Sequence, residues 1–361
     1  TMDSRICASC HTLITNTVDL SGNATGTQFV EQAIYHEWIN SSFPESGTSC
    51  QSCHLPQITD NVVISTMPPW LGPRSPFGKH HLVGANVFML KLLRQNMAVL
   101  GITATETQLD STIARAKQML QQQAVQLDVA EAGRTPDSLF VDVSLQNMAG
   151  HKFPAGYPSR RVFISVLVSN GLGDTLFYSG KVDDDFNLLQ EDDGYEPHHS
   201  TISGEDQVQI YELVMGNVNY EPTTVLERAF VPLKDNRIPP PGFTTGHPSY
   251  DTVLIAGNAL SDPDFNKVQG AEGSGKDLVH YGIATAGSDL DLLVDVKVYY
   301  QTVSGRWLDQ MFDYSSTEID AFKEYYEAAD KEPVLVASHS FVSSLTGIGD
   351  NRNVSFSVGP N

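Results

Sequence analysis

Two short stretches near the start of the chain hold all four of its cysteines. Residues 7–11 read CASCH and residues 50–54 read CQSCH, so the pattern Cys-x-x-Cys-His occurs twice. In this pattern two thiols can each form a thioether to one vinyl group of a single porphyrin, and the histidine that follows then lies under the iron. The sequence therefore predicts two haem c groups, with covalent attachment at Cys7, Cys10, Cys50 and Cys53 and proximal iron ligands at His11 and His54.

Other roles of a Cys-x-x-Cys pair explain the sequence less well. One pair alone could be a redox-active dithiol, half of a zinc site or part of a disulfide framework. A zinc ribbon needs two pairs that converge on one metal ion, and it gives no reason for a histidine directly after each second cysteine. The repeated histidine therefore favours haem over these alternatives.

Haem c is attached after a protein has been exported, so this prediction places the chain in the periplasm or outside the cell. No signal peptide, with a basic segment followed by an apolar one, is visible before the first motif. The chain is therefore expected to be a mature, processed protein or an excised part of one. It has no run of about 18 apolar residues, which predicts that there is no transmembrane segment.

The balance of charge excludes one class of partner. The chain carries 43 acidic and 22 basic side chains, which gives a net charge of −21. Nucleic acid phosphates would be repelled by such a surface, so no nucleic acid is expected to bind. A length of 361 residues suits two domains, and a hydrophobic fraction of 40% is enough to build their cores.

The first part of the sequence is expected to be rich in helices and loops. Apolar spacing predicts a helix over residues 27–40 and another over 86–100, with an irregular, proline-rich stretch between them. Thr103 and Glu106 have the spacing of a capping box, which predicts the start of a further helix. The apolar face that follows runs from Leu109 to Leu127 and predicts packing against a core.

From about residue 138 the apolar pattern changes to alternation, which predicts strands. The expected strands are 139–143, 162–168, 207–211, 293–300 and a closing one at 353–358. A single late helix is expected over residues 316–330. The predicted fold class is α+β: a dihaem cytochrome domain over 1–135, then an antiparallel, Ig-like β-sandwich domain with long loops over 136–361.

The second axial ligand of each iron must come from elsewhere in the chain. Nine histidines remain after the two proximal ones, and iron in haem readily takes imidazole. His151 lies in a loop shaped by glycine and proline, while His80 and His81 precede a predicted helix. We expect His151 and one of His80 and His81 to be distal ligands, with His36 as a further candidate. The remaining histidines are expected to be structural or exposed: His198, His199, His247, His280 and His339.

Several segments resemble the extracytoplasmic multihaem c-type cytochromes of the cytochrome c-554-like group. The resemblance covers most of the chain, and its carriers are residues 35–41 (YHEWINS), 80–86 (HHLVGAN), 150–161 (GHKFPAGYPSRR), 207–212 and 234–243. It implies that His151 is a distal ligand and favours His80 over His81. The chain departs from the group by carrying two haem motifs where relatives often have more. Phe43 also stands where more distant relatives have a histidine.

The resemblance implies an electron carrier with two bis-histidine haems. Its partners would be other redox proteins, such as multihaem cytochromes, and the chain could form a homo-oligomer or filament. The alternative is a haem enzyme with one open iron that acts on a small nitrogen, sulfur or peroxide substrate. Such an enzyme needs acid, base or cationic groups near the iron, for which His36, Glu37, Arg160 and Arg161 are candidates.

Two acidic turns raise the question of calcium. Residues 183–185 and 191–194 contain several carboxylates, which are ligands that calcium prefers. Neither turn has the spacing of an EF-hand, so a solvated acidic loop explains them more simply. Arg160 and Arg161 also have a simple alternative role, because either could pair with a haem propionate.

Overall fold

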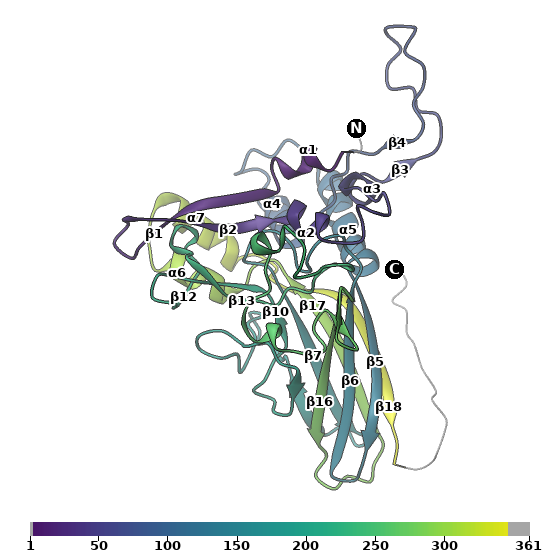
Figure 1. Ribbon diagram of the computed structural model, residues 1–361, viewed down its shortest axis with the longest axis vertical. Helices are drawn as coiled ribbons and strands as arrows, with labels where there is room; N and C mark the ends of the chain where they lie inside the picture. The colour runs from purple at the N-terminus through teal and green to yellow at the C-terminus, as the bar shows by residue number, and fades with distance from the viewer. Residues whose placement is uncertain (1–2, 346–361) are drawn as a thin grey trace.

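The computed structural model describes residues 3–345 and has the predicted α+β character, with helices gathered at one end of long antiparallel strands (Figure 1). The strand expected at 353–358 lies outside the described residues. In the described part of the chain no helix is long and apolar enough to cross a bilayer.

Two sheets form the body of the molecule. The first has the order β5-β6-β16-β9, and the second has the order β10-β7-β17-β18, with β8 paired to β7. All pairs are antiparallel except β9 with β16. The strands of the first sheet are β5 (Val125–Arg134), β6 (Ser138–Asn147), β16 (Lys276–Ala284) and β9 (Thr201–Ile202). Those of the second are β10 (Ile210–Tyr211), β7 (Arg161–Asn170), β17 (Leu292–Gln301), β18 (Val334–Ser343) and β8 (Thr175–Ser179).

Alternating apolar residues explain why these segments are strands. In β6 every second side chain from Leu139 to Leu145 is fully buried, while Phe140 on the other face is exposed. Buried residues of β7, β16 and β17 join those of β6 in one hydrophobic core. Predicted strands 139–143, 162–168 and 293–300 are confirmed, whereas 207–211 shortens to the two residues of β10. An Ig-like topology stays a prediction.

Smaller elements cover the sheets. They are β11 (Leu213–Gly216), β12 (Pro222–Thr223), β13 (Val231–Asp235), β14 (Lys267–Val268), β15 (Ala271–Glu272), and the 3-10 helices η1 (Leu226–Arg228), η2 (Tyr250–Thr252) and η3 (Gly257–Leu260). The expected late helix is α7 (Thr317–Glu327), and it is preceded by a second helix, α6 (Gly305–Phe312), which was not predicted.

The N-terminal region is less helical than predicted. Its elements are α1 (Arg5–Ala8), β1 (Thr12–Val18), β2 (Ala24–Ala33), α2 (Ile34–Ile39), α3 (Cys50–His54), β3 (Gln57–Ile58), β4 (Phe77–Gly78), α4 (Val87–Gln95) and α5 (Glu106–Gln123). The loop between β3 and β4 projects away from the body (Figure 1).

The helix expected over 27–40 is wrong in its first half. Residues up to Ala33 belong to β2, which pairs with β1, and only α2 is helical. The hydroxyl groups of Thr17 and Thr27 lie 2.9 Å apart across the two strands. Threonine stiffens an extended backbone and pairs well across strands, and this outweighs the weak helical spacing.

The start of α5 also differs from the prediction. Its capping box joins Thr105 and Gln108, two residues beyond the Thr103 and Glu106 pair expected. Ala116 and Leu120 are buried as the apolar spacing indicated, but the helix ends before Leu127, which lies in β5. Strand β5 pairs with β6 across the predicted domain boundary at 135, and that division stays a prediction.

Candidate haem-binding site

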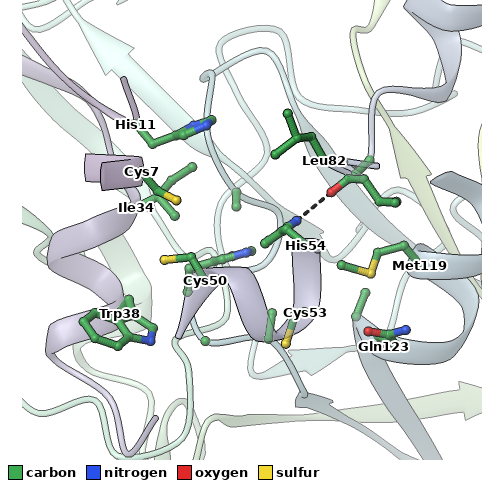
Figure 2. Close-up of a pocket in the computed structure, with 18 of the residues that line it drawn as sticks. Cys7, His11, Ile34, Trp38, Cys50, Cys53, His54, Leu82, Met119 and Gln123 are labelled. Atoms are coloured by element: carbon green, nitrogen blue, oxygen red, sulfur yellow. Dashed lines mark hydrogen bonds between the residues drawn. The ribbon is translucent and has the colours of Figure 1, made fainter. Parts of the chain in front are cut away.

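A cavity of about 830 Å³ lies between the two cysteine motifs, the C-terminal end of α5 and the loop that follows β6. This volume is near the top of the roughly 300–1,000 Å³ range of small-molecule and cofactor sites. Figure 2 shows Trp38 of α2, Cys53 of α3 and Met119 of α5 around the same space. All four cysteines line the cavity, together with His11, His54 and His151.

Helical turns present each pair of cysteines. In α3 the thiols of Cys50 and Cys53 are three positions apart, and a capping box between Ser49 and Ser52 fixes the start of the helix. In the first motif the backbone N–H of His11 donates to the carbonyl of Cys7 at 2.9 Å. Side chains three positions apart on a helical turn lie on one face, so both thiols of each pair can reach one ligand.

One thiol of each motif has a raised pKa. Burial raises the pKa of Cys7, and the neighbouring thiol of Cys50 raises it further. Burial also raises the pKa of Cys53, with Cys50 again contributing. Redox-active cysteines have a lowered pKa, which gives them thiolate character near neutral pH. The contact between Cys7 and Cys50 also brings the two motifs together at one edge of the cavity.

His54 and His151 are arranged as a pair. Their ring centres lie 6.3 Å apart and their planes differ by 20°. Bonds from imidazole nitrogen to a first-row metal are about 2 Å long, so two imidazoles on opposite sides of one metal have ring centres about 6 Å apart. The observed separation therefore fits a metal held between them.

The outer nitrogen of each ring is already engaged. Nδ1 of His54 lies 2.6 Å from the carbonyl of Val83, shown as the dashed line in Figure 2. Nδ1 of His151 lies 3.0 Å from the carbonyl of Lys152. A carbonyl can only accept, so both Nδ1 atoms carry the proton and Nε2 is left as the metal-binding atom. Burial lowers the pKa of His151, which favours the neutral form that a metal needs.

A buried network of charges holds the backbone beside His151. The N–H of Lys152 donates to Glu37 at 3.0 Å, and its ammonium lies 2.7 Å from Asp235. Arg237 joins both carboxylates, at 3.3 Å from Glu37 and 2.7 Å from Asp235. Burial opposes ionisation of Asp235, but Arg237 and Lys152 outweigh it and hold its pKa below the usual range. The network ties α2 to the loop that carries His151.

The other histidine candidates lie outside the cavity. Within residues 3–345, neither His36, His80 nor His81 is part of the lining. His80 is exposed beside Phe77, and His36 has a buried Nδ1 without a hydrogen-bond partner. The structure thus brings His54 and His151 together, while no described histidine of the cavity remains to face His11.

Of the two candidate arginines, one reaches the cavity. Arg160 is part of the lining, whereas Arg161 is buried elsewhere, with its guanidinium 3.0 Å from Glu191 and 2.8 Å from Gln301. The sequence does not show which of the two arginines lines the cavity. That depends on where strand β7 begins: Arg161 is its first residue, and Arg160 belongs to the loop before it. The roles of the Val83 carbonyl and of Asp235 were also not predicted, since both depend on tertiary contacts.

The acidic turns proposed for calcium are engaged with protein groups. Asp183 accepts from the backbone N–H groups of Asp185 and Asn187, both at 2.9 Å. Glu191 forms ion pairs with Arg161 and Arg306. These contacts use the carboxylates within the protein, and they give the calcium prediction no support.

One buried cluster has the composition of a metal site, formed by His198, Asp262 and Asp277. Nε2 of His198 lies 2.9 Å from Asp262, and the side-chain amides of Gln209 and Asn236 both donate to its Nδ1. The oxygen of each amide accepts a backbone N–H, which fixes these orientations. A histidine that binds metal through Nε2 carries its proton on Nδ1. In this cluster Nδ1 of His198 faces two donors and must accept, so the cluster does not fit a metal.

The comparisons with known proteins identify no family. No protein-family model matches the chain, and no curated protein matches it. Among solved structures, it is similar to a penta-heme cytochrome c552 from Thermochromatium tepidum, with 15% sequence identity and a TM-score of 0.48. The match covers 94% of this chain and 56% of the other, so the chain spans just over half the length of that cytochrome.

Proposed function

We propose that the chain is an electron-transfer c-type cytochrome with two haem c groups, attached at Cys7 and Cys10 and at Cys50 and Cys53. The observation that carries the proposal is the pair of parallel imidazoles at 6.3 Å, each with its Nδ1 held by a backbone carbonyl. Haem c supplies one-electron chemistry at its iron. In this proposal His54 and His151 would both bind one iron, and His11 would bind the other.

The protein groups around His54 and His151 suit electron transfer. An iron with imidazole on both faces has no position for a substrate, and burial and hydrogen bonds to the ligands tune its potential. Apolar side chains such as Leu120 and Phe153 line the cavity. The fixed Nδ1 contacts hold both rings in place, so little has to move when the charge of the iron changes.

Contact with redox partners would occur at the haem end of the molecule. Cys10 is exposed, so the edge of the porphyrin attached there would be close to solvent. The loop between β3 and β4 exposes Trp70 (84%) and Met67 (72%) near this end. Large exposed apolar side chains are typical of interaction sites. The proposed partners are extracytoplasmic redox proteins, including other multihaem cytochromes, or further copies of this chain in an oligomer or filament.

A second candidate function is favoured by the absence of a described histidine opposite His11 in the cavity. If no other group takes that position, the second iron is open and could bind a small nitrogen, sulfur or peroxide substrate. His80 or His36 would close it after a local movement, or a neighbouring subunit would supply a ligand. The state of the His11 iron therefore distinguishes a carrier from an enzyme.

The test is expression of the chain with a haem c maturation system. Mass spectrometry of the purified protein is expected to give two covalent haems, and the reduced protein is expected to show a low-spin visible spectrum. Replacing Cys50 and Cys53 by serine should remove one haem and leave the other. A protein that matures normally with no covalent haem would refute the proposal. One low-spin and one high-spin haem, with turnover of nitrite, hydroxylamine or peroxide, would favour the enzyme.

A further inference from the structure

The side chains that line the cavity have a different balance of charge from the chain as a whole. The protein has a net charge of −21, yet no Asp, Glu or Lys of the described residues lines the cavity. Arg160 is the one charged side chain in this lining. A cation in an apolar cavity is costly unless an anion accompanies it, so the cavity is suited to a ligand that carries negative charge.

The loop around Arg160 is shaped to hold its guanidinium. One amino group, Nη1, donates to the carbonyl of Ala155 at 2.6 Å. Gly156 has a φ of +84°, and a Cβ there would lie 2.7 Å from Nη1. The guanidinium has five N–H donors, and it forms no ion pair with a carboxylate of the described residues. Its remaining donors are therefore available to a ligand.

The neighbouring Arg161 has a structural role and serves as a comparison. Arg161 is buried and places its guanidinium against the carboxylate of Glu191 and the side chain of Gln301. Its charge is compensated by Glu191 and a further donor is satisfied by Gln301, as expected for a buried cation. Arg160 has no such partner among residues 3–345, although the chain contains about twice as many acidic as basic residues.

We propose that Arg160 binds an ionised carboxylate of the porphyrin held between His54 and His151. The proposal rests on the proposed function. Arginine is suited to this role because its planar fork matches both oxygens of a carboxylate. Its position agrees with this, because Arg160 lines the same cavity as His54 and His151.

The contact would have a consequence for electron transfer. Oxidation adds a positive charge at the iron, and a guanidinium near it makes that form less stable. Arg160 would therefore raise the reduction potential of this haem and compensate the charge of its carboxylate. It acts through the porphyrin and not on the iron itself, so it is a positioning and tuning residue.

The experiment compares the haem potentials of the wild type with those of Arg160→Gln, Arg160→Lys and Arg94→Gln. Arg94 pairs with Glu106 and Asp110 on the surface, so its replacement changes the net charge equally outside the cavity. We expect Arg160→Gln to lower the potential of one haem by about 59 mV, a tenfold change in its ratio of reduced to oxidised form. Arg160→Lys should retain most of the wild-type potential. Equal potentials in Arg160→Gln and Arg94→Gln would overturn the proposal.

Two further measurements keep the outcomes distinct. If Arg160→Gln does not accumulate, the contact is tested by infrared spectroscopy. The oxidised-minus-reduced difference spectrum of wild type is compared with that of Arg160→Lys. A carboxylate band that shifts supports the contact, and an unchanged band overturns it. Titration with nitrite tests for a free anion: a spectral change in wild type that Arg160→Gln abolishes would assign Arg160 to a substrate anion and overturn the proposal. A wild type without haem would instead refute the proposed function.

Discussion

The carboxylate of Glu37 accepts a hydrogen bond at 3.0 Å from the backbone N–H of Lys152, the residue directly after the histidine that faces His54. Glu37 lies in α2, between the two cysteine motifs in the sequence, and Lys152 lies in the loop between the two long sheets. The same carboxylate pairs with Arg237. One buried side chain thus connects the haem-binding segments to the β-sheet body and fixes the backbone at His151.

We expect Glu37→Gln to destabilise the protein by about 3–5 kcal/mol, because it leaves Arg237 and Lys152 buried beside a single carboxylate. Glu106→Gln is a matched control, since Glu106 pairs with Arg94 on the surface, where an ion pair contributes about 0–1 kcal/mol. Denaturant unfolding of both variants measures the difference. Similar losses would contradict a structural role for the buried network.

Gly156→Ala should lower both the stability of the protein and the potential of one haem, whereas the control Gly173→Ala should lower the stability alone. Both glycines have a positive φ, +84° and +90°, so alanine at either position should cost about 1–2 kcal/mol of stability. Only at position 156 would the new Cβ meet another group, Nη1 of Arg160. We therefore expect Gly156→Ala alone to lower the potential of one haem. Unchanged potentials in both variants would argue that Arg160 does not contact the porphyrin.

Stability should depend on pH through His280. Partial burial acts to lower the pKa of His280, but hydrogen bonds to Asp142 at 2.7 Å and to Asp264 outweigh it, and the pKa is raised. A raised pKa means that the stabilisation is complete below the unfolded pKa of about 6.5 and is lost as the pH rises through the folded value. Wild type should therefore exceed His280→Gln in unfolding free energy by more at pH 5.5 than at pH 8.5. A gap that does not change with pH would contradict this coupling.

Local patterns in the sequence predicted the long strands and the covalent part of the site. Alternating apolar residues located β6, β7 and β17, and the two Cys-x-x-Cys-His motifs located the cavity-lining cysteines. The prediction was wrong where local preferences compete, as at β2, where Thr27 contacts Thr17 of β1 although the spacing of the apolar residues also fits a helix.

The rest of the site depends on contacts between distant segments. The sequence favoured His151 from its loop, but it could not place His151 opposite His54, because that position depends on the Glu37, Asp235 and Arg237 network. It also could not separate Arg160 from Arg161. The two residues have the same side chain, and only the folded structure shows that Arg161 begins β7 and pairs with Glu191.

The central claim is that His54 and His151 are the two axial ligands of one haem. Low-temperature electron paramagnetic resonance of oxidised wild type and His151→Ala tests it most directly, with His280→Ala as a control for loss of a histidine outside the cavity. We expect His151→Ala to convert one haem from low-spin to high-spin and the control to keep the wild-type spectrum. A low-spin signal for that haem that survives in His151→Ala with unchanged g values would contradict the claim.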